Sequence, residues 1–418
     1  MKKNNRKQRK DDKEKVNKIS DVKMAYIMYG KKVFVIPIVI AIILGAVIWG
    51  IVYNARKDNA PQETADNQKE QINYIWGEIK PGKRNTNNFT TVTSSDGVQV
   101  PVPTGYTASS ASDENSASGG FVIYEGTEAV TDSNKWEAQC NRNQYVWIPI
   151  ADVSDMYWRD QTTGKKYGTR YTFSSSAYTK DATKKYEPQT TARDIQSTYL
   201  TQYLNGITRE DFLMEMEIDF DKMLNSVATY GGYYIGRYQA GDLAQATPVV
   251  KRINSDIHSQ TWYTMWKKSP KISTGGANVH MIWGIQWDET LKWLIDTGEK
   301  TYAEIGSDST SWGNYHNNSF TYYTNTSKST ATKAAKKGTR IPSGAYEGAN
   351  ANNVFDLAGN IYDWILESNG SGTGYSRCVR GGYCASYGYS DPAADRYNGV
   401  SPGVSYYDVG LRCALYIK

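Results

Sequence analysis

The sequence NVFDLAGNIYDW occupies residues 353–364 and decides how the C-terminal part of the chain is interpreted. Apolar residues stand on both sides of Gly359 and Asn360, two residue types that readily adopt a positive φ. The pattern predicts a tight turn between short extended segments. Asp356 and Asp363 flank this turn. Their carboxylates can cap the turn.

Three further segments accompany this stretch in a fixed order. They are MIWGIQWDETLKWL at 281–294, SRCVRGGY at 376–383 and GLRCALYIK at 410–418. Short β-like runs bounded by Gly, Ser and Pro lie at 98–103, 121–124, 144–150 and 232–238. Apolar residues at helical spacing predict a helix that begins after Thr208 and includes Phe212 to Leu224, and another that includes Trp287 to Ile295. Asp160–Asp194 and Ser307–Gly338 lack periodicity and are expected to be loops.

Together these segments resemble the formylglycine-generating enzyme (sulfatase-modifying factor) family, whose domain is a variant of the C-type lectin fold. The family's usual NVWDLAGNVWEW, RVLRGGSW and GFRCA motifs each appear here with small changes. The resemblance covers roughly residues 98–418 and is strongest near the C-terminus. It implies an α+β fold of twisted antiparallel strands, two helices and much irregular coil, but it does not by itself fix a function.

The family's oxidase activity rests on two cysteines, five positions apart, that follow the Gly-Gly motif and hold Cu(I). Cys384 stands at about the first position, but Tyr389 stands five residues further on. One thiolate alone binds Cu(I) poorly. The three histidines, His258, His280 and His316, also do not provide the His-x-x-x-His-x-Glu site of related iron-dependent sulfoxide synthases. We therefore expect neither copper nor enzyme activity.

Calcium fits the resemblance better than copper does. In the family, a carboxylate or amide and an acidic residue near the GN-x-W-E-W segment bind Ca²⁺ together with main-chain carbonyls. The matching positions of this sequence are Asp356, Gly359, Ile361 and Asp363. The resemblance thus implies a calcium ion with a structural role, and turn capping by the two aspartates is the alternative.

The stretch from Tyr383 to Val409 contains no Lys, Glu, Gln, Trp or Met. Each of its residues can be encoded by a codon that ends in a pyrimidine, whereas codons for the five absent types end only in a purine. The pattern resembles the variable region of C-type lectin-fold proteins that are diversified by retroelements, in which template adenines, mostly in Asn codons, are randomised. A fixed Tyr-rich binding loop is the alternative explanation.

The residues expected to contact a ligand are those that randomised Asn codons yield, with Asn398 as an unaltered codon. They are Tyr383, Cys384, Ser386, Tyr387, Tyr389, Ser390, Tyr397, Asn398, Ser405, Tyr406, Tyr407 and Asp408. Tyr presents a large, rigid contact area at low entropic cost, and Ser and Asn adapt their hydrogen bonds, as in antibody binding loops. For any single Tyr, simple packing against the domain is the alternative.

Four cysteines are too few for a disulfide scaffold in a domain of this size. Cys378 and Cys413 lie on the predicted strands that flank the variable stretch, Arg377–Gly381 and Gly410–Ile417. We expect these strands to pair in the core, which makes a Cys378–Cys413 disulfide plausible outside the cell. Cys384 would then be a chance product of diversification.

The N-terminal part predicts a membrane anchor. Val33–Tyr53 carries no charge and is long enough to cross the ~30 Å hydrocarbon core as one helix, and no small-x-small cleavage site follows it. Residues 1–32 hold 12 Lys/Arg against 4 Asp/Glu, which predicts a cytoplasmic tail and sends the rest of the chain outside. Residues 54–96 are expected to form a stalk, and residues 97–418 a domain with a variable region at about 383–409.

The formal net charge of +5 belongs to the basic tail, so the remaining chain has a net charge of −3 and no evident basic face for nucleic acid. The leading hypothesis is therefore a single-pass membrane-anchored, receptor- or adhesin-like protein on the cell surface. Its partner would be a variable protein or another surface ligand. The alternatives are a formylglycine-generating-type copper oxidase that acts on a cysteine of an exported protein, and a structural envelope protein.

Overall fold

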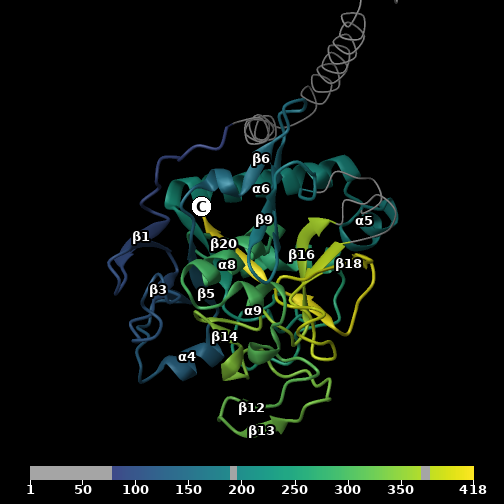
Figure 1. The fold of residues 1–418 in the computed structure, drawn as a ribbon. Coiled ribbons are helices and arrows are strands. Elements are labelled where there is room, and N and C mark those ends of the chain that lie inside the picture. The colour runs from purple at the N-terminus through teal and green to yellow at the C-terminus, as the bar shows by residue number, and fades with distance from the viewer. Residues whose placement is uncertain (1–77, 189–194, 369–376) are drawn as a thin grey trace, which may run out of the picture. The chain divides into compact units, whose positions relative to one another are not determined.

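A computed structural model describes residues 78–188, 195–368 and 377–418 (Figure 1). The expected tail at 1–32, the expected transmembrane helix at 33–53 and most of the expected stalk at 54–96 lie outside the described residues. Within the described ranges, no helix is both long and apolar enough to span a membrane.

The last motif of the sequence supplies an interior strand, next to one edge, of a six-stranded antiparallel sheet. The strand order is β11-β20-β10-β5-β4-β3. The strands are β3 (Tyr106–Ala108), β4 (Val122–Glu125), β5 (Gln144–Pro149), β10 (Gly232–Gly236), β11 (Ala277–Met281) and β20 (Cys413–Ile417). All five residues of β20 are buried, and Leu415 lies opposite both Tyr234 and Val279. The strands predicted at 121–124, 144–150 and 232–238 are confirmed as β4, β5 and β10.

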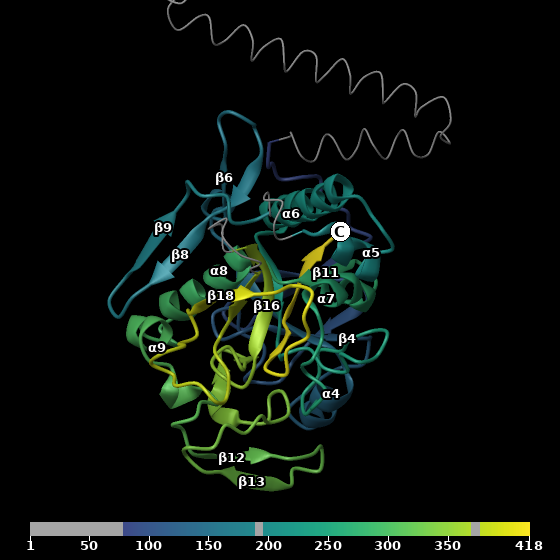
Figure 2. The ribbon, with the colours of Figure 1, turned by 90° about the vertical axis from the view of Figure 1, so that its right-hand side faces the viewer.

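Two long helices pack against this sheet where the sequence predicted them. Helix α6 (Arg209–Tyr230) begins after Thr208, whose hydroxyl accepts the N–H of Asp211 at 3.1 Å, and ends at Gly231 with a φ of 84°. It contacts β10 and β20, and Figure 2 shows it beside the C-terminus. Helix α8 (Gly284–Asp296) buries Trp287, Leu291 and Leu294. The shorter helices are α4 (Lys135–Asn141), α5 (Ser197–Tyr203), α7 (Trp262–Lys268) and α9 (Tyr302–Gly306), with 3₁₀ turns at Val153–Asp155, Ser269–Ile272, Thr310–Trp312 and Glu347–Ala349.

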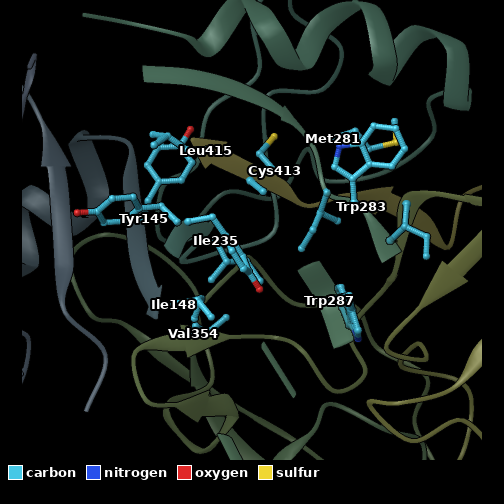
Figure 3. Close-up of a cluster of buried hydrophobic side chains, with 14 of the residues drawn as sticks. Tyr145, Ile148, Ile235, Met281, Trp283, Trp287, Val354, Cys413 and Leu415 are labelled. Atoms are coloured by element: carbon cyan, nitrogen blue, oxygen red, sulfur yellow. The ribbon is translucent and has the colours of Figure 1, made fainter. Parts of the chain in front are cut away.

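The apolar core lies where the sheet meets α8. Figure 3 shows Ile235 of β10, Leu415 of β20 and Ile148 of β5 among the core side chains, which also include Trp283 and Trp287. All five side chains are fully buried. Because aromatic and branched side chains of this size dominate core energetics, the tryptophans of the 281–294 motif stabilise the scaffold.

A four-stranded sheet with the order β18-β17-β16-β19 carries the remaining motifs. Its strands are β16 (Tyr362–Ser368), β17 (Arg377–Arg380), β18 (Arg396–Val400) and β19 (Val409–Leu411). Strand β16 is antiparallel to β17 and parallel to β19, so Asp363 lies opposite both Arg380 and Gly410. Before β16, Gly359 and Asn360 have φ values of 72° and 66°, as the sequence predicted.

The prediction that the two strands flanking the variable stretch pair with each other is wrong. Strands β17 and β19 are separated by β16, and residues 410–417 are divided between β19 in this sheet and β20 in the other. Cys378 and Cys413 therefore lie in different sheets, and both are free buried thiols rather than a disulfide. The Cys378 thiol instead donates to Asn398 Oδ1 at 2.8 Å.

Five two-stranded hairpins complete the described strands, and most of their strands lie in segments predicted as loop or stalk. The hairpins are β1 (Phe89–Thr93) with β2 (Gln99–Pro103), β6 (Tyr157–Arg159) with β7 (Lys166–Gly168), β8 (Arg170–Phe173) with β9 (Tyr178–Asp181), β12 (Phe320–Tyr323) with β13 (Thr330–Lys333), and β14 (Asn350–Ala351) with β15 (Val354–Phe355). The strand at 99–103 confirms the run predicted at 98–103, and the strands at 157–159, 350–351 and 354–355 lie outside the predicted loops. The first hairpin extends the folded domain upstream of residue 97. Aromatic cross-strand pairs such as Trp158 with Tyr167 and Phe173 with Tyr178 hold two of the hairpins, and Val100 and Val102 of β2 are buried in the main core.

A buried carboxylate joins α8 to the four-stranded sheet. Asp288 Oδ1 accepts from Nη1 and Nη2 of Arg380 at 3.0 Å each, and its Oδ2 accepts from Arg396 Nη2. Asp288 and Arg380 are fully buried. Because Arg380 ends β17 and Arg396 begins β18, one carboxylate binds both ends of the intervening segment, residues 381–395.

Replacing this carboxylate tests its structural role. We expect Asp288→Asn to lower the free energy of unfolding by about 3–5 kcal/mol, because it removes the charge shared by two buried guanidinium groups. Denaturant unfolding of the full chain in detergent measures the change. The control Asp132→Asn, at a side chain that is 58% exposed, is expected to change the free energy by no more than about 0.5 kcal/mol. Equal unfolding midpoints for the two variants would contradict the assignment.

Candidate ligand-binding surface

The predicted variable stretch forms two segments, residues 381–395 and 401–408, joined by β18. The first segment begins with Gly381 and Gly382, whose φ values are 88° and 74°. A Cβ on Gly382 would lie 2.5 Å from the carbonyl oxygen of Asp391 and 2.8 Å from the ring of Tyr315. The RGG motif therefore needs glycine here, both for the positive φ and for the close approach of the returning chain.

Backbone carbonyl oxygens hold both segments to the scaffold. Donors outside the segments reach carbonyls spread along them. The pairs are His316 with Ser386 (2.8 Å), Ser309 with Gly388 (3.1 Å), Tyr315 with Asp391 (2.8 Å), Trp287 with Ala393 (3.1 Å), Arg380 with Asp395 (2.8 Å), Trp262 with Pro402 (3.1 Å), Tyr203 with Gly403 (3.1 Å), Ser259 with Tyr406 (3.0 Å) and Tyr362 with Asp408 (2.9 Å). A carbonyl is present whatever the side chain, so these contacts tolerate a change of residue type.

The side chains of the two segments and β18 gather most of the exposed large apolar and aromatic groups. In the part of the chain that the structure describes, six large hydrophobic side chains are exposed, and five of them lie between residues 387 and 407. Tyr407 is 66% exposed, Tyr389 is 59% exposed and Tyr397 is 52% exposed. We call the exposed and half-buried side chains of residues 383–408 the Tyr-rich surface. Such a concentration of exposed aromatic groups is typical of binding sites.

The structure brings most of the predicted contact residues to this surface. Seven are exposed, namely Tyr387, Tyr389, Ser390, Tyr397, Asn398, Ser405 and Tyr407, and three are half-buried, namely Tyr383, Tyr406 and Asp408. Cys384 and Ser386 are buried, so the expectation that they contact a ligand is not met by their positions. The hydroxyl of Ser386 donates to the carbonyl of Tyr383 at 2.9 Å and thereby closes a turn.

Tyr362 connects the first segment to β18 and was missed in the sequence. Its ring stacks on Tyr383, with ring centroids 5.2 Å apart, and on Tyr397 at 5.6 Å. Its hydroxyl donates to Asp391 Oδ2 at 2.9 Å. Tyr362 lies in the NVFDLAGNIYDW motif, where attention falls on the turn and its carboxylates. The signal that could have found it is the alternation of Ile361, Tyr362 and Asp363, which is typical of a strand.

Two further residues next to the surface were also missed. Arg340 donates to the carbonyl of Tyr407, and its guanidinium lies 5.7 Å from the centre of that ring. The His316 ring lies 5.2 Å from the ring of Tyr387, which in turn stacks on Tyr389 at 5.2 Å. Both residues precede the variable stretch by many positions, and no local pattern in the sequence links them to it.

A groove of about 530 Å³ borders the surface. Tyr389, Ser390 and Asn398 line one part of it, and Arg170, Thr172 and Phe173 of β8 line another. Arg396 Nη1 donates to the carbonyl of Tyr171 at 2.7 Å and ties β8 to β18. The groove thus combines predicted variable residues with residues outside the variable stretch.

Comparison with known proteins identifies the class of domain. Residues 288–417 match the family model described as the sulfatase-modifying factor enzyme 1-like domain, which confirms the resemblance for this part of the chain. The protein therefore has an α+β fold with a domain of this family, a variant of the C-type lectin fold, in its C-terminal part. Among solved structures it is similar to Treponema denticola variable protein 1, with 16% identity, a TM-score of 0.28, and coverage of 44% of this chain and 84% of that chain. No curated protein matches the sequence.

Cys384, the counterpart of one catalytic cysteine of the family, lies below the surface. The side chain is buried, and its backbone N–H donates to the carbonyl of Asn360 at 3.0 Å. Burial raises the pKa of the Cys384 thiol to about 11, so the thiol is protonated at neutral pH. Tyr389, five residues further on, is exposed and offers no second thiolate.

The residues implied as calcium ligands have only part of their oxygens engaged. Asp356 Oδ2 accepts the N–H of Gly344 at 2.7 Å, and Asp363 Oδ2 accepts from Arg412 Nε at 3.2 Å. Oδ1 of each aspartate is buried without a hydrogen-bond partner. Burial raises the pKa of both carboxyl groups to about 6. The Ile361 carbonyl accepts from Gln239 Nε2 at 2.8 Å. Arg412 acts on both carboxyl groups and Arg252 on that of Asp356, yet one oxygen of each carboxylate keeps no partner. These two free oxygens are what a bound cation would use, and we propose calcium there with a structural role.

Thermal unfolding of the full chain tests calcium. We expect the melting temperature to rise in millimolar CaCl₂ relative to a chelator, because calcium would bind the folded state only. A concentration of 100 times Kd would add about 2.7 kcal/mol. Asp356→Asn should remove the calcium response, whereas Asp132→Asn should keep it. Identical melting temperatures of the unaltered chain in calcium and in chelator would rule the ion out.

Proposed function

We propose that this protein binds a ligand through the Tyr-rich surface and does not act as an enzyme. The observation that carries the proposal is the contrast between backbone and side chains in residues 381–408. External donors bind the carbonyls of these residues, while Tyr389, Tyr397 and Tyr407 are more than half exposed. The segments are thus held in place without using their largest side chains, which are free to contact a partner.

The chemistry of the surface supports a macromolecular partner. Tyrosine buries a large area on binding at a small entropic cost, and its hydroxyl supplies a hydrogen bond. Aromatic residues are also over-represented among the residues that dominate binding energy at protein interfaces. The stacked rings of Tyr383, Tyr362 and Tyr397 add rigidity to the surface. We propose a protein or another molecule on a neighbouring surface as the ligand.

Diversification of this surface is the second part of the proposal. The restricted residue alphabet between Tyr383 and Val409 fits randomised Asn codons. Carbonyl-held segments support it, since a protein that varies its side chains needs a backbone whose position does not depend on them. Arg380 and Arg412, which lie outside the stretch, are fully buried and bind Asp288 and Asp363. A rigid scaffold therefore carries the side chains that would vary.

Binding is favoured over the family's copper oxidation by the residues themselves. That chemistry needs a pair of thiolates, and this chain offers Cys384, a buried protonated thiol, together with Tyr389. Cys384 supports the loop, because its side chain is buried and its backbone N–H binds the carbonyl of Asn360. Ligand binding does not require its thiol to react.

We further propose that the domain is displayed outside the cell on a single membrane anchor, Val33–Tyr53, with the basic residues 1–32 in the cytoplasm. The uncharged length of the segment and the Lys/Arg excess before it support this topology. Retention in membranes washed with alkaline carbonate is expected, whereas release by the wash alone would contradict the anchor.

Loss of the exposed rings should abolish binding while the fold persists. We expect the triple substitution Tyr389→Ser, Tyr397→Ser and Tyr407→Ser to weaken the Kd for the natural ligand about 100-fold or more, because aromatic anchors dominate such interfaces. Val98→Ser is the matched control, since Val98 is the one exposed large apolar side chain of the described residues outside the surface. Melting temperatures should stay unchanged, and undiminished affinity of the triple variant would contradict the proposal.

Sequencing tests diversification separately from binding. We expect deep amplicon sequencing of codons 340–418 from a growing population to show substitutions confined to adenine-derived positions between Tyr383 and Asp408. Codons 340–380 and 410–418 serve as the internal control and should remain constant. An invariant sequence would reject diversification and leave a fixed Tyr-rich binding surface.

A further inference from the structure

A buried lysine–aspartate pair joins the β6–β7 hairpin to α6. Lys166 begins β7 and Asp221 lies on α6, and Figure 2 shows the hairpin beside this helix. Lys166 Nζ lies 2.7 Å from Asp221 Oδ2, and the two side chains are only 1% and 4% exposed. Among the lysine–carboxylate pairs of the described residues, no other has both side chains buried. Water therefore has almost no access to this amine and this carboxyl group.

The neighbouring pair of the same hairpin is solvated. Lys165, the residue before Lys166, binds Glu217 at 2.6 Å, and these side chains are 35% and 13% exposed. Glu217 and Asp221 are four positions apart on α6 and therefore share a face of the helix. Two adjacent lysines thus contact two carboxylates of one helix, and they differ mainly in their access to water.

The geometry of the buried pair brings the amine close to the carboxyl carbon. The contact does not have the direction of a hydrogen bond, and Asp221 Oδ2 has no hydrogen-bond partner. Because a carboxyl carbon lies about 1.2 Å from its oxygen, Lys166 Nζ lies no more than about 4 Å from Asp221 Cγ. Reacting atoms are about 3–3.5 Å apart in a near-attack arrangement, and fixed groups reach effective concentrations of about 10⁵–10⁸ M. A small shift of either side chain therefore places nitrogen against carbon.

Burial also disfavours the charged forms of this pair. Taking an ammonium and a carboxylate out of water costs a large part of the free energy that their attraction returns. Burial raises the pKa of Asp221 to about 7, although Lys166 and Arg159 lower it, and Glu217 raises it further. An amide between the two side chains carries no charge. Its formation would remove both charges from the interior and release water to the solvent.

We propose that Lys166 and Asp221 condense to an intramolecular isopeptide bond between Nζ and Cγ. One ammonium proton moves to the Asp221 carboxylate, which leaves a neutral amine and a carboxylic acid. Nζ attacks Cγ and forms the C–N bond. A second nitrogen proton moves to the hydroxyl oxygen, the C–O bond breaks, and one water leaves. The ammonium supplies every proton, and no oxidant takes part.

The bond would fasten the hairpin to α6 independently of the non-covalent contacts. It would close a covalent ring that contains residues 166–221 and would restrict the unfolded chain, as other cross-links do. Because the ring includes β8, β9 and most of α6, these elements would stay joined when the contacts around them open. This inference does not depend on the ligand of the Tyr-rich surface.

Mass spectrometry of the full chain in detergent tests the proposal. We expect the intact mass to be lower than the mass of the sequence by one water. Trypsin should yield a branched peptide in which residues 166–170 are joined to residues 210–222, because it does not cleave after a modified lysine. Fragmentation of this peptide should place the link at Lys166 and Asp221. Separate peptides 167–170 and 210–222 at their full masses would overturn the proposal.

Two matched substitutions identify the lysine that reacts. Lys166→Arg should restore the full mass, because a guanidinium group keeps its charge and does not attack the carboxyl carbon. Lys165→Arg, at the solvated pair, should keep the loss of one water. If Lys166→Arg does not fold, the peptides of the unaltered chain decide the question alone. A loss of water without the branched peptide would place the dehydration elsewhere and would also overturn the proposal.

Discussion

The buried carboxylate of Asp288 is the constraint on which the rest of the structure depends. It extends from α8, whose tryptophans fill the core, and binds the arginines at the end of β17 and the start of β18. Three elements that are distant in the sequence are thereby joined at one charge. Such buried pairs add little net stability relative to an apolar core, but an incorrect arrangement would leave a charge buried without a partner. The contacts of Asp288 with Arg380 and Arg396 therefore mainly fix the positions of β17, β18 and the loop between them.

A second network of the same kind lies nearby. The fully buried Arg412, between β19 and β20, donates to Asp363 and to the carbonyls of Gly236, Phe355 and Asp356. It connects the two sheets through the NVFDLAGNIYDW motif. Together the two arginine networks explain why the RGG and GLRCA motifs enclose the variable stretch. Arg380 of the RGG motif pairs with Asp288, and Arg412 of the GLRCA motif pairs with Asp363. These two ion pairs hold both ends of the variable stretch in place.

The sequence predicted the features that rest on local patterns. The helices capped at Thr208 and centred on Trp287, the strands at 121–124, 144–150 and 232–238, and the positive φ values of Gly359 and Asn360 follow from periodicity and backbone preference. Residues 288–417 also carry motifs specific enough to identify their domain family. The tyrosines of the surface were predicted from the restricted residue alphabet of 383–409 and from its resemblance to diversified variable regions.

What the sequence did not predict depends on contacts between distant residues. The strands that carry Cys378 and Cys413 lie in different sheets, which only the insertion of β16 explains. Tyr362, Arg340 and His316 border the surface through ring contacts that no spacing reveals. The hairpins at 157–181 and 320–333 are held by cross-strand pairs that mix aromatic and polar residues, and Cys384 and Ser386 are buried because the loop folds back over them.

The position of β20 between β10 and β11 has a consequence for the order in which the protein folds. Its residues are synthesised after the variable stretch, and they insert between two strands, β10 and β11, that were made long before. The six-stranded sheet therefore cannot form completely until the whole variable stretch has been synthesised. The stretch must also fold so that β20 can pair with β10 and β11. A side chain that disturbs the loops would leave β11 without its partner strand and β10 with one open edge, and quality control in the cell would act on that molecule.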